Sequence, residues 1–252
     1  MEIMQAIKMH HNFIKKRNYE VVMTTLIGSQ NYELSNETSD YDTFTFILPS
    51  ERNLYLGHEP VSGEVEVADG KCMYKDIRLA LNLLKKTSPN SIECFASKYC
   101  YYEPKYATIL TKYLNNENTL NKMLHCNYGH MLYAIAGMAH QLTKRNMSAG
   151  KRYSHALRLY SMKDNFLNFT YTSKLLKLLP RDYQEALHAK RDNIESHDVY
   201  YNDGCKNLAD ILDKCRDDFI KTPIQQAIEA EGLRLIEEMQ QELMHYYIKY
   251  IL

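Results

Sequence analysis

The sequence predicts an α+β protein in which a small strand-containing domain, residues 1–105, precedes a helical domain, residues 106–252. Two observations indicate this division. Short runs of β-branched residues, separated by turn-forming residues, occupy the first part of the chain and are typical of strands. Beyond that part, apolar residues recur at helical spacing, with Gly, Asn and Pro interrupting the pattern. A chain of 252 residues that is 45% hydrophobic is long enough for both domains.

The elements of the first domain are predicted in turn from its apolar pattern. Residues 2–17 carry Ile3, Ile7 and Ile14 among polar positions, which favours an opening helix. Four strands are expected next, at residues 19–27, 43–49, 63–67 and 71–75. The Asp69-Gly70 pair favours a tight hairpin turn between the last two strands.

Helical signals dominate from Asp76 onward. A capping box of Asn90 and Glu93 is expected to open a short helix over residues 90–97. The last helix begins with Thr222 as its N-cap and Pro223 in its first turn, and its apolar stripe is expected to pack into the core.

Composition excludes several classes of protein. Lys and Arg total 31, as do Asp and Glu, so no overall positive charge attracts nucleic acid and such a partner would need a local basic patch. The six Cys and ten His form no zinc pattern, so we expect free thiols and an oxygen-ligated metal, if any. The first residues resemble neither a signal nor a transit peptide, and no apolar run reaches the roughly 20 residues that span a membrane. We expect a cytoplasmic protein with no membrane partner.

The segment between the first two predicted strands carries the clearest chemical pattern. Gly28 lets the backbone approach a bound group, and Ser29 offers a hydroxyl and an amide to a phosphate oxygen. Asp40 and Asp42 are separated by one residue, so in an extended backbone both side chains project from one face. A cation would offset their repulsion, and Mg²⁺ favours carboxylates together with substrate phosphates. The alternative for so short a triplet is a turn with an Asx hydrogen bond.

This segment resembles the signature of the DNA polymerase β superfamily of nucleotidyltransferases, in which Gly-Ser precedes Ser-Asp-x-Asp. Here ten residues separate Ser29 from Asp40, and Tyr32 and Ser39 occupy positions favoured by predicted stand-alone bacterial and phage members. Later blocks at residues 76–78, 89–95 and 151–159 are also similar, so the resemblance covers residues from about 20 to 175. It implies a core with a small mixed β-sheet, Mg²⁺ or Mn²⁺ as cofactor, and transfer of a nucleoside monophosphate from a nucleoside triphosphate.

The resemblance also implies roles for individual residues. Asp40 and Asp42 would hold the metals, while a third carboxylate on a neighbouring strand would help to activate the attacking hydroxyl. Where similar proteins usually carry that acid, this chain has Lys71. We predict Asp69 as the third catalytic and metal-binding acid, with Glu66 next. Absence of a third acid would leave a weak enzyme or a nucleotide-binding relic.

A second group of residues would contact the nucleotide. Gly28 and Ser29 would lie near the β- and γ-phosphates, and we add Tyr32 and Ser39 to this group. Lys151, His155 and Arg158 fall at i, i+4 and i+7, so they share one face of a helix. With Lys144 and Arg145 just upstream, that face could supply cations to a triphosphate or an RNA backbone, and a solvated basic face is the alternative.

The sequence thus predicts an enzyme, a metal-dependent nucleotidyltransferase. Its acceptor stays open among an RNA 3′ end, a tRNA, a protein hydroxyl and a second nucleotide, because surfaces outside the metal core select it. RNA is the first choice, since the most similar families are linked to RNA processing or repair. The alternatives are a non-catalytic module that binds nucleotide or nucleic acid, and a protein-modifying nucleotidyltransferase.

Overall fold

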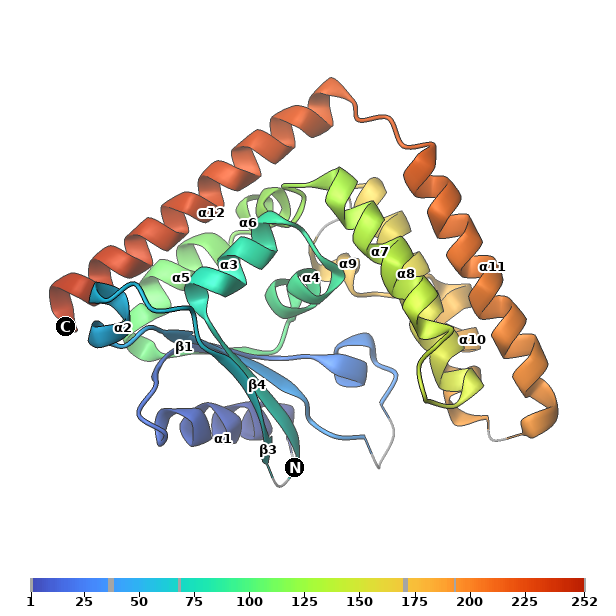
Figure 1. Cartoon of the computed structure of the whole chain (residues 1–252), viewed down its shortest axis with the longest axis horizontal. Coiled ribbons are helices and arrows are strands. Elements are labelled where there is room, and N and C mark those ends of the chain that lie inside the picture. Colours follow the sequence, from blue (N-terminus) through green and yellow to red (C-terminus); the bar gives the residue numbers. More distant parts are fainter. Residues whose placement is uncertain (1, 36–38, 68, 170–171, 193, 252) are drawn as a thin grey trace.

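One five-stranded sheet forms the centre of the first half of the chain (Figure 1). The computed structural model describes residues 2–35, 39–67, 69–169, 172–192 and 194–251. The strand order is β3-β4-β2-β1-β5, in which β2 and β4 are parallel and the other neighbours antiparallel. The strands are β1 (Glu20–Leu26), β2 (Thr43–Leu48), β3 (Ser62–Val67), β4 (Gly70–Asp76) and β5 (Cys100–Tyr102). The predicted α+β fold with a small mixed sheet is confirmed.

Helices cover both faces of this sheet and form most of the rest of the chain that the structure describes. They are α1 (Ile3–Lys15), α2 (Glu51–Tyr55), α3 (Ile77–Lys85), α4 (Pro89–Ala96), α5 (Ala107–Leu114), α6 (Glu117–Leu124), α7 (Tyr128–Leu142), α8 (Ala149–Leu167), α9 (Thr172–Leu175), α10 (Pro180–Arg191), α11 (Asp198–Asp217) and α12 (Pro223–Tyr250). Short 3₁₀ helices are η1 (Gly28–Tyr32), η2 (Pro104–Tyr106) and η3 (Glu195–His197).

Side chains of β2 lie alternately on the two faces of the sheet, because successive side chains of a strand point to opposite sides. Ile47 packs with Ile14 of α1 in a small core on one face. Phe46 stacks on Phe95 of α4 on the other face, with ring centres 5.0 Å apart. Figure 1 shows the same layers, with α1 on one side of the strands and α3 and α4 on the other. Asp42 precedes Phe44 and Phe46 by even steps, so it belongs to the α4 face.

The later helices pack against one another, and the last of them runs back to the region of the sheet. Helices α7, α8, α10 and α11 pack against one another, and α12 runs back along α6, α5 and α3 (Figure 1). Near the end of α12 the hydroxyl of Tyr247 donates to the carbonyl of Pro49, 2.7 Å away. The larger hydrophobic core contains residues from Val22 to Tyr247 and so includes both predicted domains. The division near residue 105 therefore stays a prediction.

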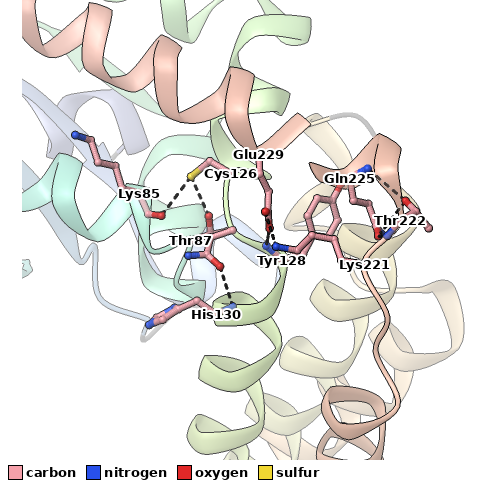
Figure 2. A network of polar contacts seen from close by, with 10 residues as sticks. Lys85, Thr87, Cys126, Tyr128, His130, Lys221, Thr222, Gln225 and Glu229 are labelled. Atoms are coloured by element: carbon pink, nitrogen blue, oxygen red, sulfur yellow. Dashed lines mark hydrogen bonds and ion pairs between the residues drawn. The ribbon is translucent and has the colours of Figure 1, made fainter. Parts of the chain in front are cut away.

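The start of α12 is fixed as the sequence predicts. Thr222 and Gln225 form a capping box, with Pro223 at the first helical position. Figure 2 shows this cap and the contact that follows it, in which the Glu229 carboxylate accepts from the amide of Tyr128 over 2.7 Å. Helix α12 is thus fixed at two points: the capping box fixes its start, and Glu229 connects it to the start of α7.

The predicted cap of α4 is wrong. The helix begins at Pro89, one residue earlier than expected, and its capping box consists of Ser88 and Ser91. Ser88 precedes a proline that suits the first helical position, and its hydroxyl accepts from the amide of Ser91. Glu93 is consequently free for another role.

Two expectations from composition can be compared with the structure. All six cysteines are free thiols. Among the residues that the structure describes, no helix has the length and apolar character needed to cross a bilayer.

Candidate active site

The chain turns sharply at Gly28, directly beside Asp42. Gly28 has a φ of 80°, in the left-handed region that favours glycine. A Cβ atom built on Gly28 would lie 3.5 Å from Oδ2 of Asp42, so the turn lies against that carboxylate. Ser29 follows, half-buried in η1, and its carbonyl accepts from the amide of Leu34 over 3.0 Å. The Gly-Ser dipeptide therefore forms a tight turn next to the second aspartate of the motif.

The backbone of two neighbouring strands fixes Asp42. Its carbonyl accepts from the amide of Ile27 over 2.9 Å, and its Oδ1 accepts from the amide of Lys71 over 3.2 Å. Asp40, two residues earlier, is exposed to solvent. Ser39, the residue before it, is half-buried. One carboxylate of the pair is thus held in place and the other extends into solvent.

A backbone hydrogen bond places Asp69 beside the aspartate pair. Its carbonyl accepts from the amide of Tyr41, the residue between Asp40 and Asp42, over 2.8 Å. Within residues 2–35, 39–67, 69–169, 172–192 and 194–251, no group of three His, Cys, Asp or Glu side chains is arranged to hold a metal ion. The two aspartates still suit a cation that arrives with a triphosphate, because Mg²⁺ is commonly held by one or two carboxylates plus substrate phosphates.

Lys71 occupies the place next to Asp42 on the adjacent strand. The parallel register pairs Thr43 with Cys72, which sets Lys71 beside Asp42. On the other side of β4, Lys71 pairs with Glu66, so Glu66 shares the sheet face of Asp42 one strand farther away. The ammonium of Lys71 bonds to Glu64 over 2.9 Å. The position nearest to Asp42 on this face of β4 therefore holds a cation instead of an acid.

Glu93 connects the Gly28 turn to the later helices. Its Oε1 accepts from the amide of Gly28 over 2.5 Å and lies 3.4 Å from Nη2 of Arg158 on α8. The side chains of Glu93 and Arg158 are only 14% and 11% exposed. Burial raises the pKa of Glu93, while Arg158 and the Gly28 amide oppose that rise. Sequence analysis missed this role, although the block at residues 89–95 contains Glu93.

Arg158 is held from a second side by an aromatic ring. Its guanidinium lies 3.6 Å from the centre of the Tyr32 ring. Tyr32 is 4% exposed, so it contacts Arg158 from within the core. Desolvation raises the pKa of the Tyr32 phenol, which remains protonated at neutral pH. Tyr32 thus acts on the site by positioning a cation.

His155 stays neutral among cations. Burial, with the charges of Arg158, Lys151, Arg145 and Lys190 acting in the same direction, lowers its pKa to about 3. Its Nδ1 lies 3.4 Å from Nη1 of Arg158. The predicted face of α8 is therefore assembled, with Lys151 exposed, His155 half-buried and Arg158 mostly buried.

Lys190 on α10 adds a cation that sequence analysis did not find. Its ammonium donates to the carbonyl of Leu34 over 2.7 Å, a few residues after the turn at Gly28 and Ser29. Burial, together with repulsion from Arg158, Lys151 and Arg191, lowers its pKa to about 8. This excess of positive charge beside a Gly-Ser turn suits a polyphosphate.

A close helix crossing brings Lys190 next to Lys151. Gly150 in the first turn of α8 lies against the carbonyl of Ala189 on α10, and a Cβ on Gly150 would stand 2.0 Å from that oxygen. The two lysines directly follow these contact residues in sequence. The absence of a side chain at Gly150 is therefore what lets the cations gather.

A comparison with protein families identifies the family of this chain. The family model described as RlaP, "RNA repair pathway DNA polymerase beta family", matches residues 1–197. The chain belongs to the RlaP family. The matched part holds the whole sheet, the aspartate pair and the cations of α8 and α10, so the predicted polymerase β-like nucleotidyltransferase relationship is confirmed.

A search of curated proteins gave no match for this RlaP-family chain. A solved nucleotidyltransferase-like protein from Exiguobacterium sibiricum 255-15 matches with 11% identity and a TM-score of 0.30, over 99% of this chain and 78% of that one.

Proposed function

We propose that this protein is a divalent-metal-dependent nucleotidyltransferase that moves a nucleoside monophosphate from a nucleoside triphosphate to a hydroxyl group of RNA. The observation that carries the proposal is the contact of the Gly28 turn with the carboxylate of Asp42. This contact places a glycine turn, of a kind that binds phosphate, beside a carboxylate, of a kind that binds metal ions. RNA is the preferred acceptor because the description of the family names an RNA repair pathway.

In this proposal Asp40 and Asp42 hold Mg²⁺ or Mn²⁺, and Asp69 is the third carboxylate. The bound metal supplies neutralisation of the charge on the transferred phosphoryl group and on the departing pyrophosphate. Ser29 and Ser39 offer hydroxyl groups to phosphate oxygens. The amide of Gly28 is already bonded to Glu93, so Gly28 contributes its compact shape.

The cations of α8 and α10 act on the phosphate tail. Lys151 and Arg158 neutralise negative charge there, and Lys190 extends the same positive surface. His155 is uncharged near pH 7 and can hydrogen-bond a phosphate oxygen without adding to the repulsion. Tyr32 serves this group by holding Arg158 in position.

The test is transfer of label from each α-³²P-labelled nucleoside triphosphate, with Mg²⁺, to RNA that bears a free 3′-hydroxyl, alongside total protein as a competing acceptor. We expect labelled RNA with the natural protein. The Asp40→Ala/Asp42→Ala variant should lose at least about 100-fold of the rate, because charge stabilisation by the metal is removed. The matched control is Asp203→Ala/Asp210→Ala, which removes two exposed acids from α11. Equal transfer by both double variants would overturn the mechanism.

A nucleotide-binding module without catalysis is the second candidate, and the cation at Lys71 is the observation that favours it. This candidate predicts a Mg²⁺-dependent thermal shift with triphosphate and no labelled product. A protein-modifying enzyme would instead place the label on protein.

A further inference from the structure

A groove of about 460 Å³ lies between the sheet and helices α3 and α4. Among its lining residues are Phe44, Met73, Lys75, Leu83, Ser88 and Asn90. Phe44 and Met73 are only partly buried, so the floor of the groove presents apolar surface. Its volume falls in the range of about 300–1,000 Å³ that is typical of small-molecule sites.

The groove adjoins the aspartate pair and runs from the Gly28 turn across the sheet to β4. Phe44 follows Asp42 by two residues and therefore shares its sheet face. Ile27, which directly precedes Gly28, and Glu93, which accepts from the Gly28 amide, line the end of the groove next to β1, and Met73 and Lys75 line its end on β4. Because β2 lies between β4 and β1, the Met73 and Lys75 end of the groove and the Gly28 turn lie on opposite sides of β2.

This arrangement has a consequence for the acceptor. In phosphoryl-type transfer the attacking and leaving oxygens are roughly in line, on opposite sides of the phosphorus. The cations Arg158 and Lys190 gather on the β1 side, where they suit the departing pyrophosphate. The acceptor hydroxyl then approaches from the β4 side, where the Met73 and Lys75 end of the groove lies.

The side chains of the groove match a nucleotide. The Lys75 ammonium lies 5.6 Å from the centre of the Phe44 ring. Lys75 makes no ion pair with any carboxylate in the part of the chain that the structure describes. Proteins bind single-stranded nucleic acid by stacking bases on aromatic rings beside cations that contact the backbone. Asn90, which is exposed at the rim, carries an amide suited to the edge of a base.

We propose that this groove binds the 3′-terminal nucleotide of a single-stranded RNA acceptor, with the base on Phe44 and the backbone phosphate at Lys75. The inference rests on the proposed function and assigns the binding site of its acceptor.

The experiment measures binding of a short single-stranded RNA, labelled at its 5′ end, by fluorescence anisotropy without metal or triphosphate. Phe44→Leu should weaken binding at least about fivefold, because a base loses its aromatic platform. Lys75→Gln should also weaken binding and should lower the slope of log affinity against log salt by about one. Both variants should bind Mg·ATP like the natural protein, and melting temperatures confirm that they fold.

A matched control exists on the opposite face of the sheet. The Lys8 ammonium on α1 lies 5.4 Å from the centre of the Tyr101 ring. This pair therefore has the same arrangement of a cation beside an aromatic ring, but it lies away from the groove. Lys8→Gln and Tyr101→Leu should bind RNA normally. Equal losses in these controls, or loss of Mg·ATP binding in place of RNA binding, would overturn the inference. If Phe44→Leu and Lys75→Gln bind RNA normally while label transfer persists, the groove inference fails and the proposed function stands.

Discussion

The guanidinium of Arg158 stacks on the ring of Tyr32, with 3.6 Å between the guanidinium carbon and the ring centre. The same guanidinium lies 3.4 Å from Glu93, which accepts from the amide of Gly28. The ring and the carboxylate together hold this cation close to the turn at Gly28. A cation fixed before the substrate arrives loses little freedom when a phosphate binds.

Arg158→Lys tests the value of that fixed geometry. Lysine keeps the positive charge but loses the planar stacking on Tyr32 and the fork of donors. We expect affinity for Mg·ATP to fall about tenfold, which corresponds to about 1.4 kcal/mol, in a calorimetric titration. The matched control is Arg216→Lys on α11, whose partners are Asp213 and Asp217. Unchanged affinity in Arg158→Lys would show that charge alone is needed.

Lys190 gives the site a dependence on pH. Its pKa is lowered to about 8, mainly by burial and also by nearby cations, from an ordinary value of 10.5. Between pH 8 and 10.5 the unfolded chain binds the proton more than the folded one does, so this group makes unfolding less favourable as pH rises through that window. Below pH 8 Lys190 is protonated in both the folded and the unfolded chain, so its contribution to the free energy of unfolding no longer changes with pH.

Triphosphate affinity should follow the opposite trend. A bound triphosphate favours the charged amine, so binding at pH 8 to 9 takes up protons and weakens as Lys190 loses its proton. We expect Kd for Mg·ATP to rise several-fold from pH 7 to pH 9.5. Lys190→Arg should give a flatter profile over this range, since arginine stays charged. Identical profiles for the two proteins would exclude Lys190 as the titrating group.

Gly150 allows the contact between α8 and α10. A Cβ there would lie 2.0 Å from the carbonyl oxygen of Ala189, so Gly150→Ala must separate the two helices. We expect a loss of about 1–3 kcal/mol in the free energy of unfolding, together with weaker triphosphate binding as Lys151 and Lys190 move apart. Gly137→Ala on α7 is the control, because no atom lies within 4 Å of the Cβ that it adds. That change should be neutral or stabilising, by up to about 1 kcal/mol, in chemical denaturation.

The first four strands and the aspartate motif could be predicted because their signals are local, whereas the three-residue strand β5 was not expected. The β-branched run before Gly28 is β1, and Asp40 and Asp42 directly precede β2 as expected. Thr222 likewise caps α12, since a cap depends on residues three positions apart. The error at α4 has the same origin. Asn90 with Glu93 and Ser88 with Ser91 have equal spacing, and the proline at 89 favours the earlier pair.

The contacts that organise the site could not be read from the chain. Gly28 meets Glu93 across 65 residues, and Glu93 meets Arg158 across another 65. Lys190 joins them only because Gly150 lets two helices approach closely. The parallel pairing of β2 with β4 also depends on the tertiary fold, and it is this pairing that sets Lys71 beside Asp42. Periodicity reports which face of an element is apolar, but it does not report which element covers it.

The third acid is tested by Asp69→Asn and Glu66→Gln. The bond from the Tyr41 amide to the Asp69 carbonyl keeps Asp69 next to both motif aspartates, whereas Glu66 is separated from Asp42 by Lys71. Three acids need not be grouped before the cation arrives, because like charges repel one another. We expect Asp69→Asn to reduce label transfer at least about 100-fold while Mg·ATP still binds, and Glu66→Gln to stay within about threefold. The reverse result would identify Glu66 as the acid. Normal transfer in both variants would mean that the two motif aspartates act without a third carboxylate.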